Sequence, residues 1–178
     1  MTTIKTIYFA GPDVFRPDLD AWRVKVIALC RKHGVTPLLP CDGTESEPET
    51  IRNTNLKLLG SASAVIANLS PFRGAEVDTG TAFEVGYACA LQKPTVGFIG
   101  DIEPIENRVG RLFGPLSKSD GNAFALRDRD GFGVEAFGLP ANLMIAAGIP
   151  IVAGDEEAAM STLLSYWMEE VRHCRAAP

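Results

Sequence analysis

The fold is decided by residues 64–99, which read AVIANLSPFRGAEVDTGTAFEVGYACALQKPTVGFI. The short apolar runs Ala64–Leu69 and Thr95–Ile99 are typical of buried strands, and the run Gly80–Leu91 between them has the length of a helix. A strand, a helix and a second strand in this order indicate a βαβ unit whose two strands are parallel.

The same alternation continues on both sides of this unit. The further elements that the sequence predicts are strands at Ile4–Ala10, Val35–Leu39 and Ile149–Val152, and helices at Asp18–Lys32, Glu47–Leu59 and Asp155–Arg172, the last with Asp155 as its N-cap. We therefore expect an α/β fold: a single domain over residues 1–178, with a parallel central sheet and helices on both faces.

Residues 100–138 interrupt this alternation, because they are rich in glycine and in charge. A long excursion inside a compact domain usually carries function or is mobile. Within it, Asp128-Arg-Asp-Gly resembles part of a calcium loop but lacks the remaining ligands. We expect a tight turn there.

Composition excludes several classes of function. Seventeen Lys and Arg against 22 Asp and Glu give a net charge of −5, so non-specific binding of nucleic acid is not expected. Two histidines, and four cysteines without a C-x-x-C pair, predict no metal site. Dinucleotide and P-loop motifs are absent, so no cofactor is predicted. Without a signal peptide or a membrane-spanning tract, we expect a cytoplasmic protein that does not bind membranes.

Glu84 is the only charged residue between Gly80 and Leu91. A helix that is apolar all round is normally buried, and a lone carboxylate on it loses solvation unless it faces a cleft or a partner. The alternative is that Glu84 only complements the positive end of the helix dipole. We favour a functional site.

A second carboxylate, Asp78, precedes this helix. As an N-cap it needs no further purpose. Glycosyl chemistry, however, requires two carboxyl groups: one attacks or stabilises the anomeric carbon, and another acid protonates the leaving group. Tyr8, at the end of the first strand, lies near Glu84 in this fold; it either orients that carboxylate or belongs to the core.

Three segments resemble the nucleoside 2-deoxyribosyltransferases: Tyr8-Phe-Ala-Gly-Pro, residues 67–88, and Phe137-Gly-Leu-Pro-Ala-Asn-Leu-Met. The match keeps the same order from residue 5 to about residue 146, and Asp78–Tyr87 is its long and specific part. The resemblance implies a flavodoxin-like α/β fold, transfer of 2-deoxyribose between nucleobases, and a place in nucleotide salvage.

The resemblance also implies roles for single residues. The glutamate that matches Glu84 is a nucleophile that forms a covalent deoxyribosyl-enzyme intermediate, and the product keeps the β configuration. The aspartate that matches Asp78 takes part in hydroxyl binding or proton transfer, and the tyrosine that matches Tyr8 holds the nucleophile. Asn142 and Met144 match residues contributed by a neighbouring subunit, which implies a homo-oligomer built from dimers with shared active sites. From the residues alone, Asn142 is equally an N-cap and Met144 equally core.

The predicted substrate-binding residues are Gly11, Phe15, Asn55, Gly80, Asn142 and Met144. Asn55 stands where some family members have an aspartate that protonates the departing base. An amide has no titratable proton to donate, although it can hydrogen-bond a base edge. Protonation would then fall to Asp78, to Asp42 or Glu76, or to water.

Two other functions stay open beside transfer between a deoxynucleoside and a free nucleobase. A nucleotide N-hydrolase uses water as the acceptor and needs a 5′-phosphate, which Ser70, Arg73 and Thr81 could bind. A non-catalytic module that senses nucleosides or nucleotides would bind them without turnover, and the isolated Glu84 counts against it.

Overall fold

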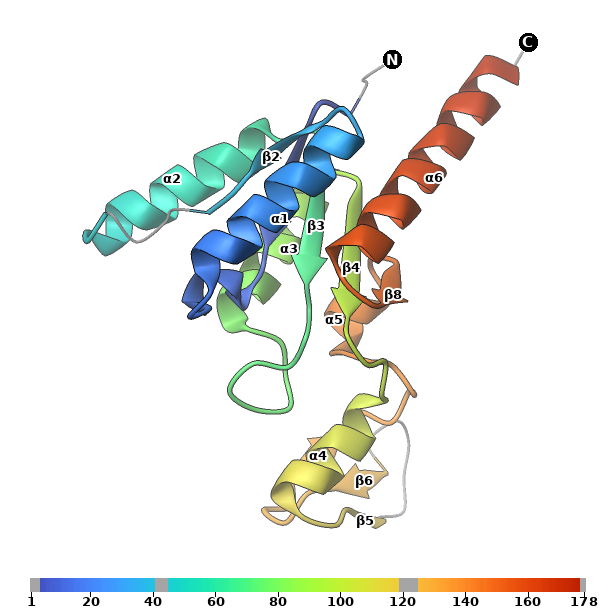
Figure 1. Ribbon diagram of the computed structural model, residues 1–178. Coiled ribbons are helices and arrows are strands. Elements are labelled where there is room, and N and C mark those ends of the chain that lie inside the picture. The colour runs from blue at the N-terminus through green and yellow to red at the C-terminus, as the bar shows by residue number, and fades with distance from the viewer. Residues whose placement is uncertain (1–3, 41–44, 119–124, 177–178) are drawn as a thin grey trace.

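Five parallel strands form the centre of the computed structural model, which describes residues 4–40, 45–118 and 125–176 (Figure 1). The strands are β1 (Thr6–Ala10), β2 (Thr36–Leu38), β3 (Ala64–Asn68), β4 (Thr95–Ile99) and β8 (Ile151–Ala153). Their spatial order is β2-β1-β3-β4-β8, and each neighbouring pair is parallel. This is the flavodoxin-like order, so the predicted fold class is confirmed.

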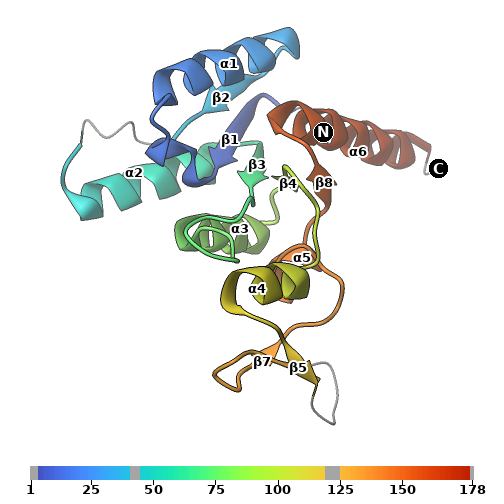
Figure 2. The same cartoon turned by 60° about the horizontal axis from the view of Figure 1, so that its bottom comes forward.

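Helices cover both faces of the sheet. They are α1 (Leu19–Lys32), α2 (Pro48–Ser61), α3 (Thr79–Ala90), α4 (Ile105–Phe113), α5 (Leu143–Ala146) and α6 (Glu156–Ala176), with a 3-10 turn, η1, at Pro12–Phe15. Figure 2 shows α1 and α6 on one side of the strands and α2 and α3 on the other. Each side has its own apolar core.

The alternation of side chains along β1 decides which core each residue joins. Ile7 and Phe9 pack in the core beneath α1 and α6, whereas Tyr8 and Ala10 pack in the core beneath α3. Tyr8 therefore faces the helix that carries Glu84.

The predicted helix ends are largely confirmed. Asp155 caps α6, since its Oδ1 accepts a hydrogen bond from the backbone N–H of Glu157 at 3.1 Å. Gly34 follows α1 with φ of 70°, a conformation that favours glycine. The predicted ends at Leu59 and Arg172 are wrong, because α2 continues to Ser61 and α6 continues to Ala176.

The composition of the third helix predicted burial on all sides, and this prediction is wrong. Thr81, Val85 and Ala88 face the sheet and are buried, whereas Phe83 is 52% exposed and Cys89 is also exposed. The sheet covers only one side of α3, so an apolar outer side remains open in this chain.

The excursion forms a structure of its own, which we call the arm (residues 100–118 and 125–138). It contains α4 and the short antiparallel strands β5 (Ser117–Lys118), β6 (Leu126–Arg127) and β7 (Gly133–Val134). Figure 1 shows α4, β5 and β6 projecting beyond the end of the central sheet. The predicted turn is confirmed: Asp128 Oδ1 accepts hydrogen bonds from the backbone N–H groups of Asp130 and Phe132, at 3.0 and 2.9 Å. No helix in the described ranges is long and apolar enough to cross a membrane.

Candidate active site

A cavity of about 390 Å³ opens where β1 ends and α3 begins. This is the edge of a parallel sheet at which ligands bind, and the volume suits a small molecule. Six predicted site residues line it: Gly11, Phe15, Asn55, Asp78, Gly80 and Glu84. Val14, Pro40, Ile51 and Thr81 complete the lining.

Glu84 and Tyr8 form the innermost contact of this site. Tyr8 is fully buried and donates a hydrogen bond from Oη to Glu84 Oε1 at 2.5 Å. Burial and the adjacent Glu84 charge raise the pKa of Tyr8 far above its usual range, so the phenol stays protonated. Tyr8 is therefore a permanent donor that fixes one oxygen of the carboxylate.

The Glu84 carboxyl is poised near neutral pH. Its pKa is raised to about 7, mainly by burial and further by the charge of Asp78, while the hydrogen bond from Tyr8 acts in the opposite direction. An ionised Glu84 is thus poorly solvated, oriented, and lines an open cavity. These properties suit a nucleophile or a general base.

Asp78 both caps α3 and lines the cavity. Its Oδ2 accepts hydrogen bonds from the backbone N–H of Thr81 at 2.9 Å and from Thr81 Oγ1 at 3.0 Å. The predicted N-cap is confirmed. Gly80 leaves room for this carboxylate, because a Cβ at that position would lie 3.1 Å from Asp78 Oδ2.

An aromatic stack borders the cavity. Phe15 lines it and stacks on Phe72, with ring centroids 5.5 Å apart. The Arg73 guanidinium lies over both rings, 5.3 Å from the Phe15 centroid and 4.6 Å from that of Phe72. This stack joins the turn after β1 to the loop after β3.

The proposed phosphate ligands do not converge on this cavity. Ser70 and Arg73 are not in its lining, and the Thr81 hydroxyl already donates to Asp78. In the described part of the chain, no Lys, Arg or His lines the cavity, whereas Glu84 and Asp78 do.

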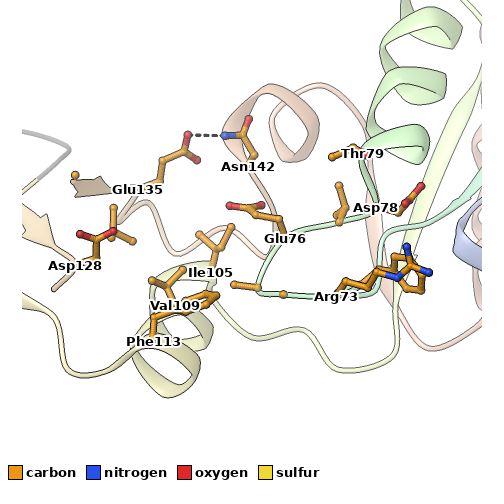
Figure 3. Close-up of a pocket in the computed structure, with 16 residues that line it drawn as sticks. Arg73, Glu76, Asp78, Thr79, Ile105, Val109, Phe113, Asp128, Glu135 and Asn142 are labelled. Atoms are coloured by element: carbon orange, nitrogen blue, oxygen red, sulfur yellow. Dashed lines mark hydrogen bonds between the residues drawn. The ribbon is translucent and has the colours of Figure 1, made fainter. Parts of the chain in front are cut away.

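Asn142 lies in a second cavity, of about 680 Å³, that shares Asp78 with the first. Figure 3 shows Asp78 on one side of it and Asn142 with Glu135 on the other. Asn142 donates from Nδ2 to Glu135 Oε1 at 2.8 Å, and its Oδ1 accepts the Met144 N–H at 3.0 Å as the N-cap of α5. Met144 is 80% exposed, so the interpretation of this residue as core is wrong. Neither Asn142 nor Met144 lines the Glu84 cavity of its own chain.

The candidates for base protonation separate as well. Asp42 lies outside the described residues. Glu76 lines the second cavity and not the first. Among the described residues, Asp78 is the second carboxyl group in the lining of the Glu84 cavity.

Three polar residues beside the site escaped the sequence analysis. Asp13 and Asn68 are hydrogen-bonded to each other behind Gly11, and the buried Arg108 donates to the backbone carbonyls of Ala75, which lines the second cavity, and of Pro140. Asn68 is the last residue of β3, which was a usable signal, whereas Asp13 lies in the turn η1, and nothing in the sequence around Asp13 or Arg108 indicated a role. Across the described ranges, no cluster of His, Cys, Asp or Glu could hold a metal ion.

Comparison with known proteins identifies the family of this chain. The family model for nucleoside 2-deoxyribosyltransferase matches residues 7–144. An uncharacterized protein of Schizosaccharomyces pombe is 30% identical over 168 residues, which cover 85% of this chain and 80% of the yeast protein.

Solved structures give the same result. The 2-desoxiribosyltransferase from Leishmania mexicana is 40% identical, with a TM-score of 0.75 over 90% of this chain and 97% of the other. A CMP N-glycosidase of Clostridium botulinum is 12% identical, with a TM-score of 0.50 over 91% and 99% of the two chains, and shares the fold alone. The chain belongs to the nucleoside 2-deoxyribosyltransferase family.

Proposed function

We propose that this protein exchanges the nucleobase of 2′-deoxyribonucleosides through a covalent deoxyribosyl intermediate on Glu84. The observation that carries the proposal is the Tyr8–Glu84 contact at the floor of the cavity, where a buried phenol orients a carboxylate whose pKa is about 7.

In the first step, an oxygen of the Glu84 carboxylate bonds to C1′ of the sugar. The C1′–N bond breaks, its electron pair leaves with the base, and the configuration at C1′ inverts. In the second step a nitrogen of the incoming base attacks C1′, and the carboxylate leaves. The proton that the incoming base loses balances the one that the departing base gains. Two inversions return the β configuration.

Asp78 and Asn55 serve the two ends of the substrate. Asp78 is the second carboxyl group among the described lining residues, and we assign to it the binding of a sugar hydroxyl or the transfer of a proton towards the base. Asn55 has an amide that can hydrogen-bond a base edge but cannot protonate it. Phe15 offers a ring on which a base can stack.

The charge of the cavity supports a nucleoside substrate over a nucleotide. A 5′-phosphate would enter a space lined by Glu84 and Asp78, with no cation among its described lining residues. A neutral deoxynucleoside avoids that repulsion. The N-hydrolase alternative therefore has less support.

We also assign Asn142 and Met144 to the site of a neighbouring chain in a homo-oligomer. Their position outside the chain's own Glu84 cavity and the 80% exposure of Met144 support this. The open apolar side of α3 around Phe83 supports it too, because exposed apolar surface of this kind commonly marks an interface.

The activity is tested by incubating the protein with 2′-deoxyinosine and free adenine and separating the products. We expect 2′-deoxyadenosine and hypoxanthine in equal amounts. In parallel, 2′-deoxyinosine 5′-monophosphate should react far more slowly. Release of free 2-deoxyribose 5-phosphate from the nucleotide, without transfer to adenine, would instead establish the hydrolase.

A further inference from the structure

We propose that Asp13 and Asn68 form a positioning pair that holds the turn wall of the active site, defined as Gly11, Val14 and Phe15, and thereby sets the affinity for the nucleobase. This inference rests on the proposed function, but the pair itself does not line the cavity.

The pair joins two segments that are distant in sequence. Asn68, the last residue of β3, donates from Nδ2 to Asp13 Oδ2 at 2.9 Å, and Asp13 lies in the turn η1. Asn68 Oδ1 accepts the backbone N–H of Ser70 at 3.1 Å, so the Asn68 side chain is itself held in place. The loop after β3 thus fixes the turn after β1.

Gly11 shows how closely the pair supports the wall. A Cβ at Gly11 would lie 2.7 Å from Asp13 Oδ2 and 2.9 Å from Asn68 Cβ. Real Cβ contacts are not that short, so only glycine fits at this point of the cavity lining. A change in the pair therefore moves the wall directly.

Loss of the hydrogen bond from Asn68 would also leave the buried Asp13 carboxylate poorly compensated. The residue is only 5% exposed, and burial raises its pKa, while the hydrogen bond from Asn68 opposes that shift. Arg16 adds a longer contact, Nη1 to Oδ1 at 3.5 Å, from a half-exposed side chain. The mechanism uses neither side chain of the pair, so a buried carboxylate here needs another explanation, and support of the wall supplies one.

The wall faces the base and not the sugar. Glu84 and Asp78, the two carboxylates suited to C1′ and the sugar hydroxyls, belong to α3 and its N-cap, whereas the turn wall contributes an aromatic ring and no charge. Glu84 is oriented by Tyr8, independently of the turn. A loosened wall should therefore weaken base binding more than it slows the chemical step.

The test exchanges the two side chains. The single variants Asn68→Ala and Asn68→Asp remove the hydrogen-bond donor, and Asp13→Asn removes the negative charge of the acceptor. The double variant Asp13→Asn/Asn68→Asp restores an amide donor opposite a carboxylate, and the new carboxylate can still accept the Ser70 N–H. The double variant Asp20→Asn/Asn107→Asp makes the same chemical exchange at two exposed positions and serves as the matched control.

Two quantities are measured in every variant. The first is the KM for adenine as acceptor beside kcat, and the second is hydrogen–deuterium exchange in the peptide that contains residues 11–16. For Asn68→Ala and Asn68→Asp we expect the KM for adenine to rise about tenfold or more, the scale of one lost hydrogen bond to a charged group, with a smaller change in kcat and faster exchange. The exchanged pair should recover most of both, and the control should match the unaltered protein.

Each outcome decides between distinct claims. Unchanged KM in the Asn68 variants, or faster exchange with no change in KM, overturns the proposal, because the pair would then be structural only. Failure of the exchanged pair to recover either quantity also overturns it. If the unaltered protein transfers no deoxyribose, the proposed function fails; the exchange measurement then still decides whether the pair holds the turn.

Discussion

The hydrogen bond from Tyr8 to Glu84 makes a signed prediction about pH. A nucleophilic carboxylate must be ionised, so kcat/KM should decrease as the pH drops below the pKa of Glu84 in the free enzyme, about 7. We call this decrease the acid limb of the pH profile. Tyr8→Phe deletes the donor without removing the ring. Because the donor favours the ionised form, its loss raises the pKa of Glu84.

The magnitude follows from the strength of such a bond. A hydrogen bond to a charged group contributes about 1.5–3 kcal/mol, which would move the acid limb to between about pH 8 and pH 9. At pH 7 the ionised fraction would fall from about one half to about one tenth or less, and kcat/KM would fall at least about fivefold from this cause alone. On the alkaline plateau only the loss of orientation should remain.

Asp78→Asn should shift the pKa of Glu84 in the opposite direction. Its charge raises the pKa of Glu84, so the amide should move the acid limb below pH 7, while an amide oxygen can still accept from Thr81 and preserve the cap. The assay is the initial rate of transfer from 2′-deoxyinosine to adenine between about pH 5 and pH 10. An acid limb that stays near pH 7 or moves down in Tyr8→Phe would refute the reasoning.

Three further predictions concern stability and assembly. Glu84→Gln should lose transfer activity yet raise the free energy of unfolding above pH 7 by at most about 3 kcal/mol. The reason is that the raised pKa of Glu84 destabilises the unaltered protein progressively as the pH rises from the ordinary 4.5 to about 7. Urea unfolding at about pH 5 and about pH 8 checks this. Arg108→Met should lower the free energy of unfolding by about 2–4 kcal/mol, since it strips the backbone carbonyls of Ala75 and Pro140 of their donor, and Arg108→Lys should recover only part, as measured by urea unfolding. Glu84→Gln chains co-expressed with Asn142→Ala chains should be far more active than either variant, because a mixed oligomer contains sites with one intact residue of each kind; activity no higher than that of the two variants alone would contradict shared sites.

The central sheet could be predicted because its signals are local. Each strand is a short apolar run, and each helix shows apolar spacing or a capping residue such as Asp155. The contact between Tyr8 and Glu84 also follows from local patterns, since alternation along β1 directs Tyr8 towards α3. Asn55, by contrast, was predicted from the resemblance to the family and not from a local pattern.

The structure of the arm and the side-chain pairs that join different loops could not be predicted from the sequence. Strands of two residues, such as Ser117–Lys118, are too short to show a period, and they form by antiparallel pairing with one another. The Asp13–Asn68 pair depends on how the loops after β1 and β3 meet, and Arg108 depends on a contact between the arm and residues 75 and 140. The exposed side of α3 was misjudged because composition alone does not show which side lacks a cover.

The central claim is that Glu84 bonds to the sugar, and covalent trapping tests it most directly. A 2′-fluoro arabinosyl nucleoside should slow release of the intermediate, because the fluorine destabilises the oxocarbenium-like transition state. After incubation and proteolysis, mass analysis should find the fluorinated sugar on the peptide containing Phe83-Glu84-Val85, and Glu84→Gln should give no adduct. An adduct on Asp78, or turnover by Glu84→Gln at the rate of the unaltered protein, would contradict the account.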